Sequence, residues 1–423
     1  MNPPRILMFA PSCYPPGNPE AFVNANLVLA FLAAGWEIDV VSRSGLDQWY
    51  PSDLDPWRAV ASRATAVAEI PRTLANRLLG GLKVPLASGQ LAPGARWAYP
   101  AAREGLRLAA RKRYDFILSR VLPSDAHLAA FIVARKTGIP WIANWNDPSP
   151  WEKFPPPYAG GRGSGAGLGF WGTRYYRAVA RTAAWHTFPC ERLRDYVAGY
   201  LPGGIGGKSS VIPHVALEKG SEPPPLNASF TLLHAGSLRE PRSCESYLQG
   251  VSIFLERVRP KSGVSVVFIV DRPDEVLAAA RTSGVEAVVR IEKGRPYTEM
   301  PAALAGADVL VIIEAPVAQG IFLPSKFVDY VRSRRPILAV SPAVGTLADL
   351  IGRHGGGVAA DVNRPEQIAS AIAGLYQQWE QGTLDERFGS AGLYPLFSQE
   401  TVLAAYGEIF SRISHQAKGA RHD

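Results

Sequence analysis

The sequence Leu323-Pro324-Ser325-Lys326-Phe327-Val328-Asp329-Tyr330, followed by Arg335-Pro336-Ile337-Leu338-Ala339-Val340, decides the fold. It predicts a helix start, then a turn, then a buried strand, because proline suits the first helical turn, where the N–H groups lack partners. Those N–H groups and the helix dipole attract anions, and Ser325 and Lys326 add a hydroxyl and a positive charge. Asp329 follows one turn later, where its carboxylate can accept hydrogen bonds from sugar hydroxyls. The segment therefore favours binding of a nucleotide-diphosphate sugar.

Strands and helices alternate on both sides of this segment, which predicts parallel, doubly wound sheets. In the first half, we expect strands over residues 5–10, 36–42, 115–119, 140–144, 185–188 and 210–212, and a helix over 19–34. In the second half, we expect strands over residues 230–234, 264–270, 288–291, 307–313 and 336–340. Further helices are expected over residues 243–258, 274–282, 367–379 and 399–413.

A segment rich in glycine, proline and serine separates the two series, and Pro223-Pro224-Pro225 forms a semi-rigid linker within it. A chain of 423 residues also exceeds the usual size of a single core. We predict an N-terminal domain over residues 1–205, an interdomain segment over 206–229, a C-terminal domain over 230–396, and a terminal helix with a tail over 397–423. Two such domains leave a cleft between the carboxyl ends of both sheets.

The net charge is +8, and the excess is concentrated between Arg72 and Arg113. Nine basic residues in that segment accompany a single acid, Glu104, together with several leucines, a tryptophan and a tyrosine. Such a segment either lies on an anionic membrane surface or forms a solvated helical face. No zinc-finger, RNA-recognition or helix-turn-helix signature occurs in the sequence, so nucleic acid is not an expected partner.

The expected compartment follows from the apolar runs and the cysteines. No apolar run approaches the roughly 18–20 residues of a membrane span, and the first one, Ile6–Ala10, is too short for the core of a signal peptide. The three cysteines lack metal or disulfide spacing, which fits a reducing compartment. We expect a cytoplasmic protein, either free or peripheral at the inner membrane face.

Five further motifs accompany the opening segment. They are Pro15-Pro16-Gly17-Asn18-Pro19-Glu20, Trp141-Ile142-Ala143-Asn144-Trp145-Asn146-Asp147-Pro148, Ser210-Val211-Ile212-Pro213-His214-Val215, Leu233-His234-Ala235-Gly236-Ser237-Leu238 and Glu240-Pro241-Arg242. In this order, over most of the chain, they resemble the family-4-like glycosyltransferases of the GT-B fold, in the Pro-Ser-Lys subtype. The resemblance implies two Rossmann-like, doubly wound parallel-sheet domains that face a central cleft, with a C-terminal helix that crosses back to the N-terminal domain. It also implies transfer of a hexosyl-type group from a UDP- or GDP-type sugar to a hydroxyl of a saccharide or lipid-linked saccharide, without a metal or another cofactor.

The resemblance and the predicted strand ends together give a candidate site. The expected donor-binding residues are Gly17, Gly236, Arg239, Arg242, Ser325, Lys326 and Asp329. The expected catalytic residues are Asp147, Arg120 and Glu314, each of which follows a predicted strand. Each charged residue also has a structural alternative: exposed ion pairs for the loop arginines, a helix surface for Lys326, a helix-dipole contact for Asp329, and a loop cap for Asp147.

The sequence also departs from the family pattern. Ser243 replaces an expected lysine, and Ile321 and Phe322 stand where a sugar-contacting glutamate is usual, so Glu314 is the candidate substitute. These departures keep two other functions open. One is a sugar-nucleotide epimerase of the same architecture, and the other is a catalytically degenerate scaffold that binds a nucleotide sugar.

Overall fold

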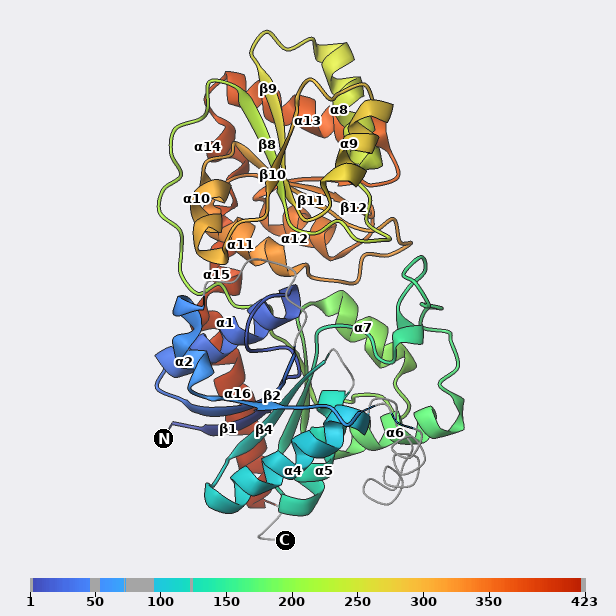
Figure 1. Ribbon diagram of the computed structural model, residues 1–423, viewed down its shortest axis with the longest axis vertical. Helices are drawn as coiled ribbons and strands as arrows, with labels where there is room; N and C mark the ends of the chain where they lie inside the picture. Colours follow the sequence, from blue (N-terminus) through green and yellow to red (C-terminus); the bar gives the residue numbers. More distant parts are fainter. Residues whose placement is uncertain (1–2, 46–53, 72, 74–94, 122–124, 420–423) are drawn as a thin grey trace.

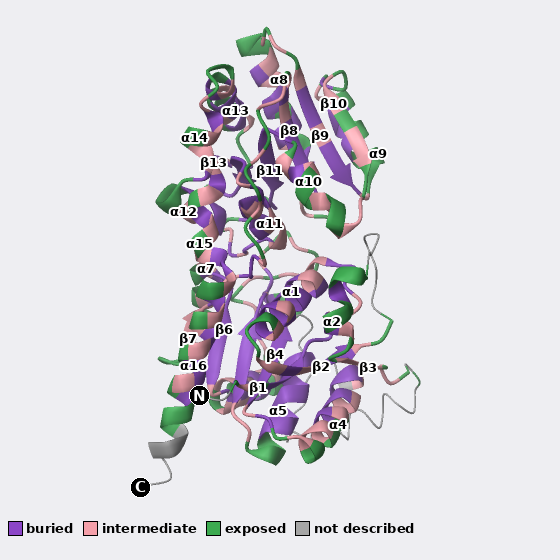
Figure 2. Ribbon diagram, turned by 90° about the vertical axis from the view of Figure 1, so that its left-hand side faces the viewer, coloured by how far each residue is buried: buried purple, intermediate pink, exposed green. Residues whose placement is uncertain are grey.

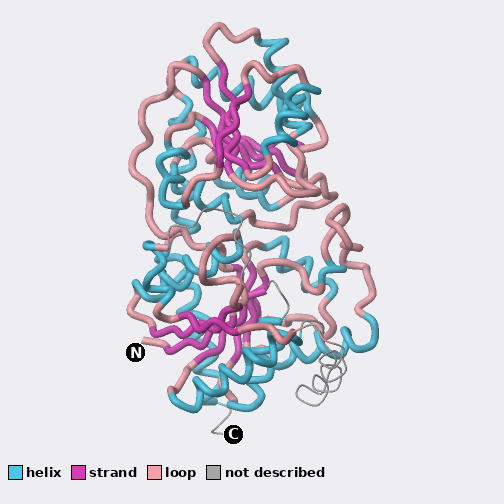
Figure 3. The backbone as a smooth tube through the Cα atoms, viewed as in Figure 1, coloured by secondary structure: helices cyan, strands magenta, loops and turns pink. Residues whose placement is uncertain are grey.

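The computed structural model describes residues 3–45, 54–71, 73, 95–121 and 125–419. They form two α/β domains, which lie one above the other in Figure 1 with the N-terminal domain below. Each domain has a central parallel sheet with helices on both faces, and Figure 3 shows the strands of each sheet gathered inside a shell of helices. The predicted fold class is confirmed.

The N-terminal sheet has seven parallel strands in the order β3-β2-β1-β4-β5-β6-β7. Reversal of the strand order on the two sides of β1 is the doubly wound arrangement, and ligands bind at the carboxyl ends of such strands. The strands are β1 (Arg5–Phe9), β2 (Glu37–Arg43), β3 (Ala64–Val67), β4 (Phe116–Val121), β5 (Trp141–Trp145), β6 (Trp185–Phe188) and β7 (Ser209–Val211).

The C-terminal sheet has six parallel strands in the order β10-β9-β8-β11-β12-β13. Its strands are β8 (Phe230–Ala235), β9 (Val264–Val270), β10 (Val289–Lys293), β11 (Val309–Ile313), β12 (Ile337–Ser341) and β13 (Gly357–Asp361). The central strands β11 and β12 are buried at every residue, as the continuous apolar runs predict for a sheet covered on both faces. Figure 2 shows the same pattern in both sheets, with buried strands inside and exposed helix faces outside.

Helices cover both sheets. Those of the N-terminal domain are α1 (Pro19–Ala33), α2 (Arg58–Ala61), α4 (Ala95–Arg111), α5 (Asp125–Thr137), α6 (Gly169–Thr182) and α7 (Glu191–Tyr200). The second half of the chain contributes α8 (Glu245–Val258), α9 (Pro273–Thr282), α10 (Met300–Ala305), α11 (Ser325–Ser333), α12 (Thr346–His354), α13 (Pro365–Glu380), α14 (Leu384–Phe388), α15 (Tyr394–Phe397) and α16 (Gln399–Gly419). Short 3-10 helices occupy η1 (Asp55–Trp57), η2 (Trp151–Lys153), η3 (Tyr297–Glu299) and η4 (Ser390–Leu393).

The last helix, α16, belongs to the N-terminal domain in space. It crosses from the upper to the lower domain in Figure 1, and its Phe410 ring stacks on Phe116 with the centroids 4.2 Å apart. Tyr406 contacts Phe31 of α1 edge-on at 5.1 Å. The predicted crossing of the C-terminal helix is therefore confirmed, and it ties the two ends of the chain to one core.

Two parts of the predicted layout need comment. Strand β7 lies beyond residue 205, the predicted end of the N-terminal domain, yet it pairs with β6 and extends the N-terminal sheet. Arg72 and residues 74–94 of the basic segment lie outside the described residues. Among the helices that the structure does describe, none combines the length and the apolar composition needed to cross a bilayer.

Candidate functional site

A cavity of about 1060 Å³ lies between the two domains, at the carboxyl ends of both sheets. Its N-terminal wall comes from the start of α1 and from the loop after β5. Its C-terminal wall comes from the loops after β8, β9, β10 and β11 and from the start of α11. A volume of this size fits a nucleotide sugar and part of a second substrate.

The segment over residues 323–330 forms part of the C-terminal wall. Pro324 precedes α11, and no side-chain hydrogen bond caps the first turn. The Phe327 N–H donates to the Pro324 carbonyl oxygen at 3.0 Å, so the N–H groups of Ser325 and Lys326 are the ones that an anion can use. Ser325 and Lys326 both line the cavity. Gly236, with a φ of +116°, lies so close that a Cβ added there would be 2.9 Å from Lys326 Nζ.

The ammonium group of Lys326 lies beside the His234 ring and near Arg242. Its Nζ lies 3.5 Å from His234 Nε2, while His234 Nδ1 lies 3.0 Å from the carbonyl oxygen of Val311. A carbonyl only accepts hydrogen bonds, so Nδ1 carries the proton and Nε2 presents a lone pair to the lysine. Burial, together with the charge of Arg242, lowers the pKa of Lys326 to about 7. An anion in the cavity would favour the charged form and reverse this effect.

Arg242 and Glu314 face each other beside the lysine. Arg242 Nε lies 3.3 Å from Glu314 Oε1, but the geometry is not that of a hydrogen bond, and this buried Nε has no hydrogen-bond partner among the described residues. The Glu314 charge raises the pKa of Arg242 further above its usual range. The guanidinium is thus fixed at the cavity wall with donor capacity that a phosphate oxygen can use.

Arg239 and Asp329 lie at the two ends of the same wall. Arg239 donates to Ser237 Oγ and to Asp271 Oδ2, each at 3.0 Å, and it is partly exposed. Asp329 accepts a hydrogen bond of 2.8 Å from the Tyr297 hydroxyl. Burial raises the pKa of Asp329 above its usual value.

The N-terminal wall carries two carboxyl groups. Glu20 Oε1 accepts hydrogen bonds from Asn24 Nδ2 at 3.0 Å and from Asn146 Nδ2 at 2.6 Å. Burial raises the pKa of Glu20 to about 7. Burial also raises the pKa of Asp147 to about 7, and the neighbouring Glu20 charge adds to the effect. Both groups line the cavity.

Two predicted residues lie behind the lining. Arg120 is 4% exposed and its Nε donates to Asn24 Oδ1, so it acts on the cavity through the chain from Arg120 to Asn24 to Glu20. Gly17 is buried in the loop before α1, and its neighbour Asn18 lines the cavity and caps α1 by accepting from the Ala21 N–H at 3.0 Å. The structure brings the other eight predicted site residues together around the cavity: Asp147, Gly236, Arg239, Arg242, Glu314, Ser325, Lys326 and Asp329.

Sequence reasoning missed several lining residues. Glu20 stands at the end of a quoted motif but received no role. The loop after β5 places Trp151, Phe154 and Tyr158 against the cavity, where Trp151 is 47% exposed and stacks on Phe154 at 4.2 Å. Tyr158 meets Phe322 of the other domain at 5.4 Å. An aromatic cluster with one exposed ring is thus built from loops of both domains, and only the fold reveals it.

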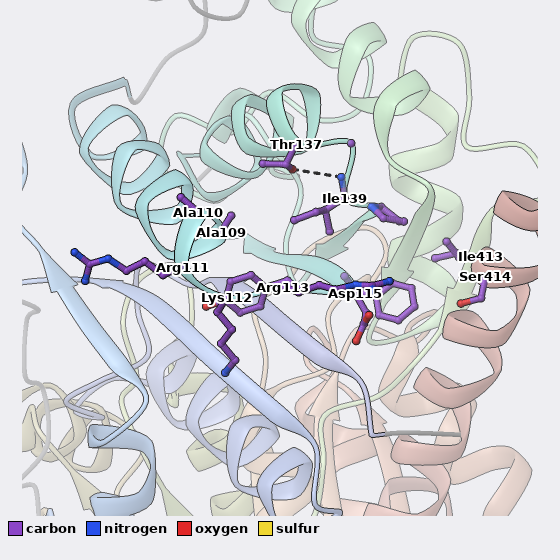
Figure 4. Close-up of a pocket in the computed structure, with 14 residues that line it drawn as sticks. Ala109, Ala110, Arg111, Lys112, Arg113, Asp115, Thr137, Ile139, Ile413 and Ser414 are labelled. Carbon is purple, nitrogen blue, oxygen red and sulfur yellow. Dashed lines mark hydrogen bonds between the residues drawn. The ribbon is translucent and has the colours of Figure 1, made fainter. Parts of the chain in front are cut away.

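A second hollow, of about 680 Å³, lies at the opposite end of the N-terminal sheet. Figure 4 shows it between the ends of α4 and α5 and the side of α16, where Arg111, Lys112, Ile139 and Ile413 are labelled. It therefore lies at the amino ends of β4 and β5. Ligands of doubly wound sheets bind at the carboxyl ends, so the cavity between the domains is the better candidate. Within the described ranges, no three His, Cys, Asp or Glu side chains are grouped to hold a metal ion.

Comparison with solved structures places this architecture among known folds. Anabaena HepE, solved with UDP and glucose, is 12% identical to this chain, with a TM-score of 0.66. The match covers 97% of this chain and 100% of the HepE chain. A glycosyltransferase from Rickettsia africae is 10% identical over 98% of this chain and 99% of its own, with a TM-score of 0.67. A Listeria monocytogenes structure described as a UDP-N-acetylglucosamine 2-epimerase is 12% identical over 97% and 98%, with a TM-score of 0.55. No protein-family model matches the chain, and no curated protein matches it in sequence. The likeness shows that the chain has the GT-B fold.

Proposed function

We propose that the protein transfers a hexosyl group from a UDP- or GDP-type sugar to a hydroxyl of a saccharide or lipid-linked saccharide. The observation that carries the proposal is the contact of Lys326 with Gly236 at the uncapped start of α11. A diphosphate at this point would meet an ammonium group, the Arg242 guanidinium and free N–H groups. These are the donors that stabilise a departing diphosphate.

The proposed chemistry divides between the two walls. The bond between the anomeric carbon and the phosphate oxygen breaks, and its electron pair leaves with the diphosphate toward Lys326 and Arg242. The acceptor oxygen forms the new bond to the anomeric carbon and loses its proton to the carboxylate of Asp147, with Glu20 beside it as a second proton acceptor. Glu314 and Asp329 would accept hydrogen bonds from donor hydroxyls. Cationic side chains and helical N–H groups supply the stabilising charge, so we propose a reaction independent of a metal.

The fold likeness supports the donor class. The Anabaena relative binds UDP and glucose, and UDP-glucose in a further structure of that protein with a TM-score of 0.64. The two chains align over nearly their whole length.

The test is release of nucleoside diphosphate from a panel of UDP- and GDP-sugars, with and without saccharide acceptors. We expect turnover with at least one donor, and loss of that turnover in Lys326→Ala. The matched control is Lys261→Ala, an exposed lysine of the loop before β9. Thermal shift against UDP and GDP gives a readout of binding alone. Absence of both turnover and nucleotide stabilisation across the panel would reject the proposal.

An epimerase of the same architecture is the second candidate, favoured by the Listeria relative and by the two carboxyls with pKa values near 7. Incubation with the donor alone distinguishes the two functions, because an epimerase forms the epimer without an acceptor. Deuterium from heavy water would also enter the sugar ring if a carbon-bound proton were exchanged. Stabilisation by nucleotide without any turnover would instead support the third candidate, a binding scaffold.

A further inference from the structure

Helix α6 (Gly169–Thr182) presents a face of aromatic and basic side chains on the outside of the N-terminal domain. Phe170, Arg174, Arg177 and Arg181 follow one another at helical spacings of four, three and four residues, so they form one stripe. Phe170 is 72% exposed, and Trp171 beside it is 47% exposed. Their rings touch edge-on, with centroids 4.9 Å apart.

The opposite face of α6 fixes the helix to the domain. Tyr175, Tyr176 and Val179 are buried in the core, and the Tyr176 and Ser149 hydroxyls lie 2.8 Å apart within hydrogen-bond reach. The exposed stripe is therefore held in place by a packed helix. Two neighbouring large aromatic rings that are both exposed form an apolar patch, and such patches rimmed by polar residues are typical of interaction sites.

The charge of this face is uncompensated in the part of the chain that the structure describes. Helix α6 contains no acidic residue, and none of its three outward arginines has an ion pair with a described residue. Two of the four arginines of α4 differ, because Arg107 pairs with Glu104 and Arg96 pairs with Glu69. The α6 face is thus a positively charged surface with apolar rings at its N-terminal end.

We propose that the α6 face, defined as Phe170, Trp171, Arg174, Arg177 and Arg181, docks on an anionic lipid bilayer. Arginine side chains next to anionic headgroups gain electrostatic free energy that salt reduces. Aromatic rings favour the depth of the headgroups, where an apolar body and a polar edge are both accommodated. A helix with this composition lies along the surface and does not span the membrane.

Helix α6 is connected in sequence to the cavity lining through the loop after β5. The loop after β5 begins with Trp151 and Phe154 at the cavity and leads directly into α6. In Figure 1 this loop descends along the outer side of the N-terminal domain from the level of the cleft to α6. A bilayer against α6 would therefore lie on the same side of the domain as this loop. Docking itself does not depend on the proposed transfer reaction.

The test is co-sedimentation of the full chain with vesicles, without any nucleotide. One set contains phosphatidylcholine alone, and the other contains equimolar phosphatidylcholine and phosphatidylglycerol. We expect binding to the anionic vesicles only, weakened by salt. Arg174→Ser with Arg177→Ser and Arg181→Ser should lower the partition coefficient about 100-fold, and Phe170→Ser with Trp171→Ser should lower it by at least about 10-fold.

The control removes three arginines and two exposed apolar side chains, here aliphatic ones, from the C-terminal domain. It combines Arg257→Ser, Arg281→Ser and Arg290→Ser with Val258→Ser and Leu277→Ser, all at exposed positions. The control should bind vesicles like the unchanged protein, and circular dichroism checks that each variant is folded. The proposal is overturned if the unchanged protein ignores anionic vesicles or if the α6 variants bind as well as the control. A mass in solution that falls from dimer to monomer in the α6 variants, without vesicle binding, would also overturn it by identifying a second copy as the partner.

Discussion

The two walls of the cavity differ in their charged side chains. The C-terminal wall combines five basic side chains, Arg239, Arg242, Lys293, Arg295 and Lys326, with five acidic ones, Glu240, Asp271, Glu292, Glu314 and Asp329. The described lining of the N-terminal wall has no lysine or arginine, but it has the carboxyls of Glu20 and Asp147. His214, near the junction, has a pKa lowered to about 3 by burial and stays neutral.

Lysine and arginine side chains lie only on the C-terminal wall of the described lining, so we expect the two walls to serve different steps of the proposed reaction. Burial, together with the charge of Arg242, lowers the pKa of Lys326, and a bound diphosphate would favour the charged lysine again. Burial raises the pKa of Asp147 to about 7, and the Glu20 charge adds to the effect, which suits the proton transfer that we propose for this group. Substitutions on the C-terminal wall should therefore weaken nucleotide binding, whereas substitutions on the N-terminal wall should lower kcat without changing nucleotide binding.

The largest expected effect is on the C-terminal wall. Lys326→Ala should lower kcat/KM for the donor about 100- to 1000-fold, the range seen when one fixed donor to a developing negative charge is removed. It should also weaken stabilisation by nucleoside diphosphate in a thermal shift, whereas Lys261→Ala should change neither. Equal nucleotide stabilisation in the variant would remove Lys326 from the phosphate site.

In the unchanged protein, Lys326 should make both the stability and the nucleotide affinity depend on pH. Its pKa is lowered from 10.5 to about 7 in the folded protein, so the unfolded chain binds more protons between these values. Stability in the absence of ligand should thus rise with pH across that window through this group. Nucleotide affinity should fall above pH 7, because the free protein has then lost the charge that the diphosphate meets.

On the N-terminal wall, Asp147→Asn should lower kcat about 100-fold while it leaves nucleotide stabilisation unchanged. The amide keeps the size of the side chain but cannot take the proton of the acceptor hydroxyl. Steady-state kinetics with saturating donor, together with the thermal shift, separates the two readouts. If kcat is preserved, Asp147 only shapes the loop before Pro148.

Much of the fold could be predicted from local sequence. Strands such as β11 and β12 are continuous apolar runs next to a proline-started helix, and such runs are typical of a buried parallel sheet. Strands β3 and β13 were not predicted. Residues 64–67 alternate only weakly and lie at an edge of the sheet, and β13 begins in Gly355-Gly356-Gly357, which predicts a turn. The structure explains Gly357: a Cβ there would lie 1.9 Å from the carbonyl oxygen of Ile337, so only glycine lets β12 and β13 approach.

The site residues also fall into two groups: those that local sequence predicts and those that only the fold brings together. Ser325, Lys326 and Asp329 are visible in the sequence because a helix start is a local feature. Glu20 is not, because its role comes from Asn146, which is 126 residues away along the chain. Its hydrogen bonds and its burial arise only when α1 and the loop after β5 meet at the cavity.

A smaller effect should come from Gly236→Ala, which tests how tightly the phosphate side of the cavity is built. The added methyl would meet Lys326 Nζ at 2.9 Å, and the φ of +116° disfavours alanine. Displacement of the ammonium group should lower kcat/KM about 10-fold or more. Gly374→Ala, at an exposed position of α13 with open space around it, is the control and should be as active as the unchanged protein. Full activity in Gly236→Ala would mean that the lysine moves freely and is not positioned by this contact.

The smallest expected effect belongs to Glu20→Gln, which tests whether the two carboxyls act as a pair. The variant keeps an oxygen for Asn24 and Asn146 but removes the like charge beside Asp147, so the pKa of Asp147 should fall. The acid limb of the pH–rate profile should move to lower pH by about half a unit, the size expected for one screened charge.

The pKa of Glu20 is raised from 4.5 to about 7 on folding, so its charge destabilises the folded protein increasingly as pH rises through that window. The variant should therefore gain more in Tm at pH 8 than at pH 4. An unmoved acid limb with this gain in Tm would show that Asp147 titrates independently of Glu20, and the N-terminal wall would then hold one proton acceptor and one buried structural carboxyl.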